Sequence, residues 1–248
     1  MKLKHITFTG VDERTNISRL REIQQAYPIA EFGVLTSYHW YENGNRYLNP
    51  RMFKYLLGNG LNLSLHICGR AAKDFASGES SDIHYLTWGK YNLFKRIQLN
   101  LANRKNNPEI VSGSLWDYQE IIIQQKGIDN LDLYQRTVKD RIERPYIGEV
   151  SVLLDASGGH GIDTPIEILN TKAKVGYAGG FNPENVADKL EYLFENVPGD
   201  FWIDMETGVR TDDWFDLDKV IKVLEICQPI INKYSWDQLP ENKSLFKR

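Results

Sequence analysis

The sequence alternates short β-like runs with helix-like segments, and this alternation constrains the fold more than any other feature. The runs are eight, at residues 5–10, 30–37, 61–68, 94–102, 120–125, 149–157, 174–180 and 200–207. Strands separated by helices pair in parallel, because each helix returns the chain to the edge of the sheet from which it left. Eight such units in 248 residues indicate an α/β fold of the (β/α)8 TIM barrel class. A doubly wound open sheet is the alternative, but the first turn, FTGVDERT, lacks the G-x-G-x-x-G motif.

Between these runs, apolar residues recur at helical spacing over residues 16–26, 50–57, 183–194 and 216–226. The third of these helices has the clearest start, with Asn182 as N-cap, Pro183 at the first helical position and Glu184 beside the positive end of the helix dipole. Residues 103–148 are the least regular region, where we expect a weak strand and a modified helix. We expect one domain over residues 1–248, since no linker or repeat divides the chain.

Composition and charge narrow the possible functions. The chain is 42% hydrophobic and 25% charged, as in an ordinary soluble globular protein. Its formal net charge of -3 provides no general attraction to nucleic acid or to an anionic membrane. The first residues, MKLKHITFTG, contain no signal-peptide core, and no apolar run is long enough to span a bilayer. Cys68 and Cys227 are far apart and form no CxxC motif, which favours a reducing compartment, so we expect a cytoplasmic protein.

Polar residues gather where the predicted strands end, which is the functional face of a barrel of this class. Residues two apart in a strand share a face, so neighbouring polar residues at these positions point the same way. The candidates are Thr9, Ser37, Asp155 and Thr207, together with three pairs, His66 with Cys68, Gln98 with Asn100, and Asp204 with Glu206. Several carboxylates at one mouth predict acid/base chemistry on a small molecule.

The run at 174–180 ends in Gly179 and Gly180, directly before the helix start at Asn182. Glycines leave the main-chain amides uncovered, and the start of a helix attracts anions. We therefore expect a phosphate group at this turn. A helix cap requires no ligand, so an ordinary turn is the alternative.

Several candidates also have purely structural explanations. Asp155 fits an ordinary turn residue, and His160 fits an exposed loop. His66 and Cys68 supply only two metal ligands, so a packed histidine beside a buried cysteine is the alternative, and we expect no metal or cofactor. Arg46, in the aromatic stretch SYHWYENGNRY, suits bidentate binding of a carboxylate.

Taken in chain order, these motifs resemble phosphoribosylanthranilate isomerase, a phosphate-binding barrel family of tryptophan biosynthesis. AGGFNPENV (178–186) nearly repeats the family's Ala-Gly-Gly-Leu-Asn-Pro-Glu-Asn-Val, LLDASGGHG (153–161) resembles its Leu-Leu-Asp and Gly-Gly-Thr-Gly, and DMETGVR (204–210) resembles its Asp-Val-Ser-Ser-Gly-Val-Glu. FTG (8–10), RYLNP (46–50) and QLNL (98–101) stand where the family has Ile-Cys-Gly, Arg-Tyr-Ile-Ser-Pro and Gln-Leu-His-Gly. The resemblance implies a (β/α)8 barrel of the ribulose-phosphate-binding type.

The resemblance also implies a reaction, a cofactor-free Amadori rearrangement that converts an aminoaldose phosphate into an aminoketose phosphate, as an intramolecular oxidoreductase does. By resemblance, Asp155 is the general acid, Arg46 binds the anthranilate carboxylate and Asp204 faces the sugar. The other implied site residues are His66, Asn100 and His160 around the substrate, and the amides of Gly159, Gly179, Gly180, Thr207 and Gly208 around the phosphate.

Thr9 departs from this pattern, since it stands where the family has its catalytic base, a cysteine. A threonine hydroxyl does not ionise near neutral pH, and losing a well-placed base costs about 10²- to 10⁴-fold in rate. Glu206 stands where the family has a serine, and its charge would repel a phosphate held close by. We therefore do not expect the standard isomerase activity.

Three hypotheses follow from these residues. The first is relocated isomerase-type chemistry on a phosphorylated sugar or a related metabolite, with Asp155 as acid and Glu206, His66 or Cys68 as base. The second is a barrel that binds a phosphorylated ligand without catalysis, as a sensor or scaffold. The third is a metal-assisted lyase or hydrolase. In each case the partner is a small molecule rather than a nucleic acid or a membrane, and the protein is a monomer or a homodimer.

Overall fold

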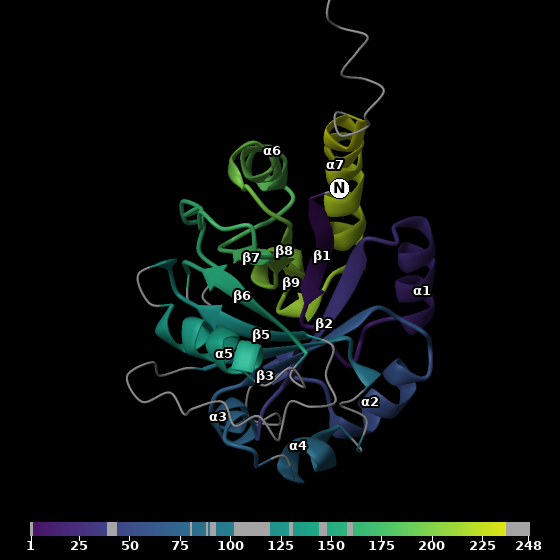
Figure 1. Cartoon of the computed structure of the whole chain (residues 1–248). Helices are drawn as coiled ribbons and strands as arrows, with labels where there is room; N and C mark the ends of the chain where they lie inside the picture. The colour runs from purple at the N-terminus through teal and green to yellow at the C-terminus, as the bar shows by residue number, and fades with distance from the viewer. Residues whose placement is uncertain are drawn as a thin grey trace, which may run out of the picture.

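Eight parallel strands close into a barrel in the computed structural model, with helices around the outside (Figure 1). The structure describes residues 2–38, 44–79, 81–87, 89, 93–101, 120–128, 131–143, 148–157 and 161–236. The strands are β1 (Leu3–Thr9), β2 (Ala30–Thr36), β3 (Leu63–Cys68), β4 (Arg96–Asn100), β5 (Glu120–Gln125), β6 (Glu149–Asp155), β7 (Val175–Ala178) and β8 (Phe201–Met205). Each strand pairs with the next in the sequence, and β8 pairs with β1. The predicted (β/α)8 barrel is confirmed, and the open-sheet alternative is wrong.

The connections contain seven α-helices among the described residues. They are α1 (Ile17–Ala26), α2 (Pro50–Leu57), α3 (Arg70–Ala76), α4 (Ser81–Leu86), α5 (Asp132–Glu143), α6 (Val186–Asn196) and α7 (Leu217–Trp236). None of these helices is both long enough and apolar enough to cross a membrane. After β8, the 3₁₀ turn η5 (Thr207–Val209) leads into a hairpin of β9 (Arg210–Thr211) and β10 (Trp214–Phe215).

Two predicted helices have different bounds in the structure. The helix expected from Pro183 begins at Val186, because the Asn182 side chain accepts hydrogen bonds from the amides of both Glu184 and Asn185 and holds residues 183–185 in a turn. The helix expected to end at Ile226 continues through Pro229 to Trp236. Its buried face also continues, with Cys227, Ile230 and Ile231 packed in the core, which explains the extension.

The structure describes part of the region expected to be irregular, residues 103–148. β5 and α5 lie within residues 103–148, and β5 pairs with both of its neighbours over several residues. Residues 102–119, 129–130 and 144–147 lie outside the described part of the chain.

The interior of the barrel is filled below its mouth. Near the N-terminal ends of the strands, the buried Arg96 pairs with Glu31 and Glu120 at 2.6 and 3.1 Å. Above this cluster, Trp202 packs with Ile122 and Leu153. Gly176 is required there, because a Cβ at this position would overlap the Trp202 ring. The described side chains thus fill the N-terminal end of the barrel, and the carboxyl ends of the strands are the functional face of such barrels.

Candidate functional site

A cavity of about 510 Å³ opens at the carboxyl ends of the strands. Its walls carry most of the residues expected from the sequence, namely Thr9, Arg46, His66, Asn100, Asp155, Gly179, Gly180, Asp204, Glu206, Thr207 and Gly208. Gly159 and His160 lie outside the described residues. The structure thus brings together side chains and turns from both halves of the chain.

The cavity also has lining residues that sequence reasoning missed. Gln124 and Ser157 belong to it, as do Tyr47 and Phe181. Gln124 was detectable, because it follows Ile122 on the same face of a strand that ends at the mouth. Tyr47 belongs to the aromatic stretch SYHWYENGNRY that also contains Arg46. Phe181 was not expected, since it comes from a connection whose path depends on the folded barrel.

Asp204 and Thr9 form a buried pair at the wall of the cavity. The Thr9 hydroxyl donates a hydrogen bond of 2.7 Å to Oδ1 of Asp204. Burial raises the pKa of Asp204 to about 7, and the negative charge of Glu206 adds to the rise, while the Thr9 hydrogen bond opposes it. A carboxyl group with a pKa near the ambient pH exchanges protons efficiently in both directions. Asp204 therefore has the acid/base character that Thr9 lacks.

Asp155 is the second buried carboxyl at the mouth, and donors hold both of its oxygens. Oδ2 accepts a hydrogen bond of 2.7 Å from the side-chain amide of Gln124. Oδ1 accepts from the main-chain N–H and the hydroxyl of Ser157, at 3.1 and 2.7 Å. These bonds fix the orientation of the carboxyl group at the end of β6.

Arg46 enters the cavity from the connection between β2 and α2. Its Nη1 lies 2.9 Å from Glu206 Oε1, and its Nε lies 2.9 Å from Asp213 Oδ1. Burial raises the pKa of Glu206, and the charge of Arg46 opposes the rise. The guanidinium expected to bind a substrate carboxylate is therefore paired with two carboxylates of the protein itself.

His66 and Cys68 are poor candidates for a base in this environment. Burial lowers the pKa of His66 to about 3, with the charge of Arg96 adding to the effect, so the ring is neutral. Both ring nitrogens are engaged, one with Ser64 Oγ at 3.0 Å and the other with the Gln98 amide at 3.2 Å. Burial raises the pKa of the Cys68 thiol to about 12, and a protonated thiol is a weak nucleophile and a weak base.

No group of three or more His, Cys, Asp or Glu side chains in the described part of the chain is arranged to hold a metal ion. The His66 and Cys68 pair thus has no third ligand there. These residues give no support to the metal-assisted hypothesis.

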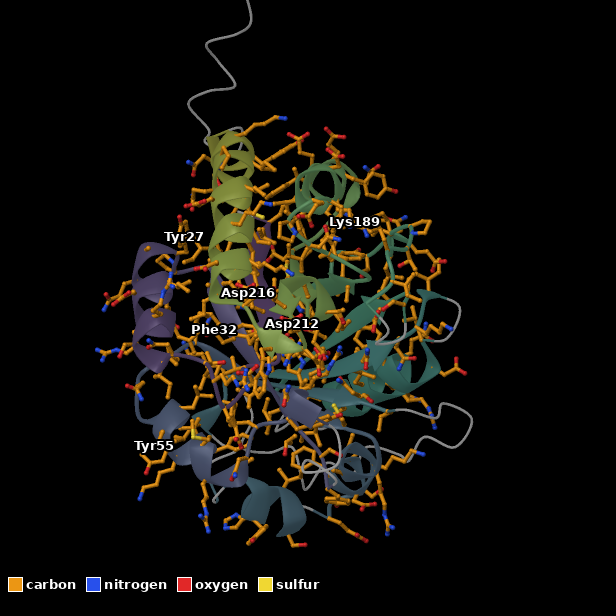
Figure 2. The ribbon with its side chains drawn as sticks, turned by 180° about the vertical axis from the view of Figure 1, so that it is seen from behind. Tyr27, Phe32, Tyr55, Lys189, Asp212 and Asp216 are labelled. Carbon is orange, nitrogen blue, oxygen red and sulfur yellow. The ribbon has the colours of Figure 1, made fainter. Side chains whose placement is uncertain are left out.

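The turn after β7 directs its main-chain amides away from α6. The carbonyl oxygen of Gly179 accepts from Lys189 of α6 (Figure 2) at 2.8 Å, and that of Gly180 accepts from the Asn185 side chain at 2.9 Å. In a trans peptide the N–H points opposite to the carbonyl, so the amides of Gly180 and Phe181 face the other way. Gly179 and Gly180 both have positive φ, at 126° and 71°, and both line the cavity.

The turn after β8 supplies further amides. The first hydrogen bond inside η5 runs from Val209 N to Glu206 O, at 3.2 Å, so the amides of Thr207 and Gly208 precede it and have no partner within the turn. A Cβ at Gly208 would overlap the carbonyl oxygen of Phe181, and a Cβ at Gly161 would overlap the Thr207 side chain. The turns that follow β6, β7 and β8 therefore contact one another at the edge of the cavity.

Comparison with known proteins gives a likeness of fold. No protein-family model and no curated protein matches the chain. The solved structure of N-(5'-phosphoribosyl)anthranilate isomerase from Pyrococcus furiosus is similar, with a TM-score of 0.51 and 15% sequence identity, over 91% of this chain and 98% of that one. At this identity the likeness shows the shared barrel fold and leaves the activity to be argued from the site.

Proposed function

We propose that this barrel binds a phosphorylated sugar, or a closely related metabolite, at its mouth and carries out isomerase-type acid/base chemistry on it. One observation carries the proposal. Asp204 is a buried carboxyl with a pKa of about 7, it is bonded to Thr9, and it faces the cavity that the turns after β7 and β8 also line. The alternative of relocated chemistry with Glu206, His66 or Cys68 as base is weaker. Glu206 is paired with Arg46, the pKa of His66 is too low for its ring to hold a proton near neutral pH, and the Cys68 thiol is protonated.

In this proposal Asp204 is the base that removes the substrate proton. Thr9 cannot be that base, because its hydroxyl does not ionise near neutral pH. Thr9 donates to Oδ1, so the proton of the neutral carboxyl group lies on Oδ2. The ionised form removes the proton from C2 of the opened sugar while the general acid protonates the C1 oxygen, which gives an enediol. Asp204 then returns its proton to C1 as the general acid recovers a proton from the O2 hydroxyl, and the product is the ketose. This use of one tuned carboxyl group agrees with the general rule that a catalytic pKa lies near the working pH.

Asp155 serves as the general acid that opens the sugar ring. Gln124 yields Oδ2 to the ring oxygen when the substrate binds, while Ser157 continues to hold Oδ1. Asp155 and Asp204 come from β6 and β8 and line the same cavity, so a small sugar can contact both. His66 and Asn100 line the cavity as neutral side chains that can form hydrogen bonds with the ligand.

The phosphate binds main-chain amides of Gly180, Phe181, Thr207 and Gly208 in this proposal. The neighbouring Glu206 side chain, whose charge would repel a phosphate, is directed to Arg46 instead, with Oε1 2.9 Å from Nη1. Successive main-chain N–H groups in turns can form a concave anion site and require no basic side chain. That feature suits this cavity, whose described walls hold three carboxylates, Asp155, Asp204 and Glu206, and one cationic side chain, Arg46.

The phosphate site is tested by a matched pair of variants at Thr207. Thr207→Asp places a negative charge beside the proposed phosphate, and Thr207→Asn has nearly the same shape without the charge. Ribose 5-phosphate should raise the melting temperature of the wild type and of Thr207→Asn, but not that of Thr207→Asp. Equal stabilisation of both variants would show that phosphate binds elsewhere.

Catalysis is tested by proton exchange at C2. Wild-type protein in D2O should exchange the C2 proton of a bound aldose phosphate, as followed by NMR. Binding without exchange, across a panel of aldose and aminoaldose phosphates, would instead support the hypothesis of a non-catalytic phosphate-binding barrel.

A further inference from the structure

Arg46 and its carboxylate partners determine which charges of a ligand the cavity can bind beside them. Arg46 is the one cationic side chain among the described residues that line the cavity. Its guanidinium contacts Glu206 and Asp213, each at 2.9 Å, through two different nitrogens. Asp213 also lies 3.4 Å from Nε of Arg210, which pairs with Asp12 at 3.3 Å. Two guanidinium groups thus lie among three carboxylates, and this cluster has no excess of positive charge to offer a ligand.

The hairpin after η5 delivers the second of these carboxylates, and the fold holds it firmly. Asp212, labelled in Figure 2, and Asp213 form the turn of this hairpin. Their φ angles are 51° and 59°, in the left-handed region that few non-glycine residues adopt and that aspartate adopts more readily than most. The buried Arg210 donates to the carbonyl oxygen of Asp213 at 2.6 Å and to that of Gly10 at 2.7 Å. The contact between Arg46 and Asp213 is therefore anchored rather than incidental.

The segment directly after β8, residues 206–208, contacts two other connections of the barrel. The Glu206 side chain reaches Arg46, which follows β2. The backbone of Gly208 packs on Phe181, which follows β7. One short segment thus approaches the proposed phosphate through its amides and presents a carboxylate to Arg46.

We propose that Glu206 determines the class of ligand by occupying the position on Arg46 that a ligand carboxylate would take. The site then accepts phosphosugars whose other end is neutral or cationic, such as a hydroxyl or an amine, and rejects those that carry a carboxylate there. A ligand carboxylate would lie beside Glu206 without a free cation to offset the repulsion, whereas an amine or a hydroxyl finds an acceptor in the Glu206 carboxylate. The phosphate part of this inference rests on the proposed function, and the selection at Arg46 stands on its own geometry.

The test uses small probes that omit the phosphate. Benzoate and benzylamine have similar size and opposite charge, and their affinities for the wild type, Glu206→Gln and the double variant Glu206→Gln/Arg46→Gln can be measured by NMR titration. Glu206→Gln removes the charge at nearly constant shape, and thermal unfolding checks that each variant is folded. Glu206→Ala provides a second measurement in case the glutamine amide itself blocks Arg46.

Glu206→Gln should raise the benzoate to benzylamine affinity ratio at least tenfold, and the double variant should lose the gain because the guanidinium is gone. An unchanged ratio in both Glu206 variants, or a gain that persists in the double variant, would overturn the inference. Ribose 5-phosphate is titrated separately against the Thr207 variants. Failure of that titration together with the expected benzoate result would refute the phosphate site and leave the role of Glu206 intact.

Discussion

Both ends of the barrel interior carry buried charged side chains. The two ends differ in whether these side chains have partners of opposite charge. At the N-terminal end, Arg96 lies between Glu31 and Glu120, and Lys174 also contacts Glu120, at 2.7 Å. At the C-terminal end, Asp204 has a hydroxyl group as its hydrogen-bond partner rather than a cation. Both Arg96 and Asp204 are less than a tenth exposed, so burial alone does not separate the two ends.

The comparison shows that two buried carboxyl groups, Glu120 and Asp204, differ in whether a cation lies beside them. Glu120 lies beside Arg96 and Lys174, and these two charges lower its pKa although burial acts in the opposite direction. Asp204 has a hydroxyl group as its partner instead, and burial raises its pKa to about 7. The following changes test this difference.

The largest expected effect is the loss of exchange activity in Asp204→Asn. The asparagine side chain can still accept the Thr9 hydrogen bond but cannot take a proton, so C2 exchange should fall by about 10²- to 10⁴-fold. NMR in D2O measures the rate, and Thr9→Ser, which keeps the hydroxyl, is the control that should retain exchange. An Asp204→Asn protein that keeps a tenth of the wild-type rate would exclude Asp204 as the base.

Arg96→Met should cause the largest loss of stability. Removing the cation leaves the buried carboxylates Glu31 and Glu120 without a partner, and breaking a buried pair in this way costs about 3–5 kcal/mol. Urea denaturation at pH 7 measures the free energy of unfolding. Arg96→Lys retains the charge and should lose less. A loss below about 1 kcal/mol in Arg96→Met would mean that the two ends of the barrel do not differ as described.

The pH dependence of stability should reveal the raised pKa of Asp204. The pKa of Asp204 rises from 3.8 to about 7 on folding. Between these values the folded protein holds the proton and the unfolded chain does not. The contribution of Asp204 to the free energy of unfolding is therefore lost as pH rises from 3.8 to about 7. Relative to Asp204→Asn, the wild type should lose up to about 4 kcal/mol between these pH values, at about 1.4 kcal/mol per pKa unit. Denaturation of both proteins from pH 5 to 8 measures most of the change. A difference that does not vary with pH would contradict the assignment.

The smallest effect is expected at the rim of the N-terminal cluster. Glu149→Gln removes a half-exposed partner of Lys174, which keeps its shorter contact with Glu120. Exposed pairs contribute little, so the free energy of unfolding should change by less than about 1 kcal/mol. A larger loss in the same urea assay would show that the exposed Lys174–Glu149 pair also stabilises the fold.

Local patterns in the sequence were sufficient to predict much of the fold. The eight strands were expected from apolar runs and their flanking turns, and their order follows from the alternation with helices. The same periodicity indicated that His66, Gln98 and Asp204 lie at strand ends on the interior face. It could not indicate that the Asn182 turn precedes α6, because that depends on how the side chain divides its hydrogen bonds between two amides.

The interactions that tune the site could not be predicted in this way. The pair of Thr9 with Asp204 and the pair of Arg46 with Glu206 join residues that are more than 150 positions apart. The occupation of Arg46 by Glu206 and Asp213 also depends on the path of the hairpin after η5, and no local motif specifies that path.

The sequence by itself determined the barrel and the polar character of its mouth, because period-two and helical alternation are local properties that each segment carries independently. Only the tertiary structure decided which carboxyl group is left without a cation and which guanidinium is already neutralised. These properties depend on distances and burial that exist only after β8 has paired with β1 and closed the barrel.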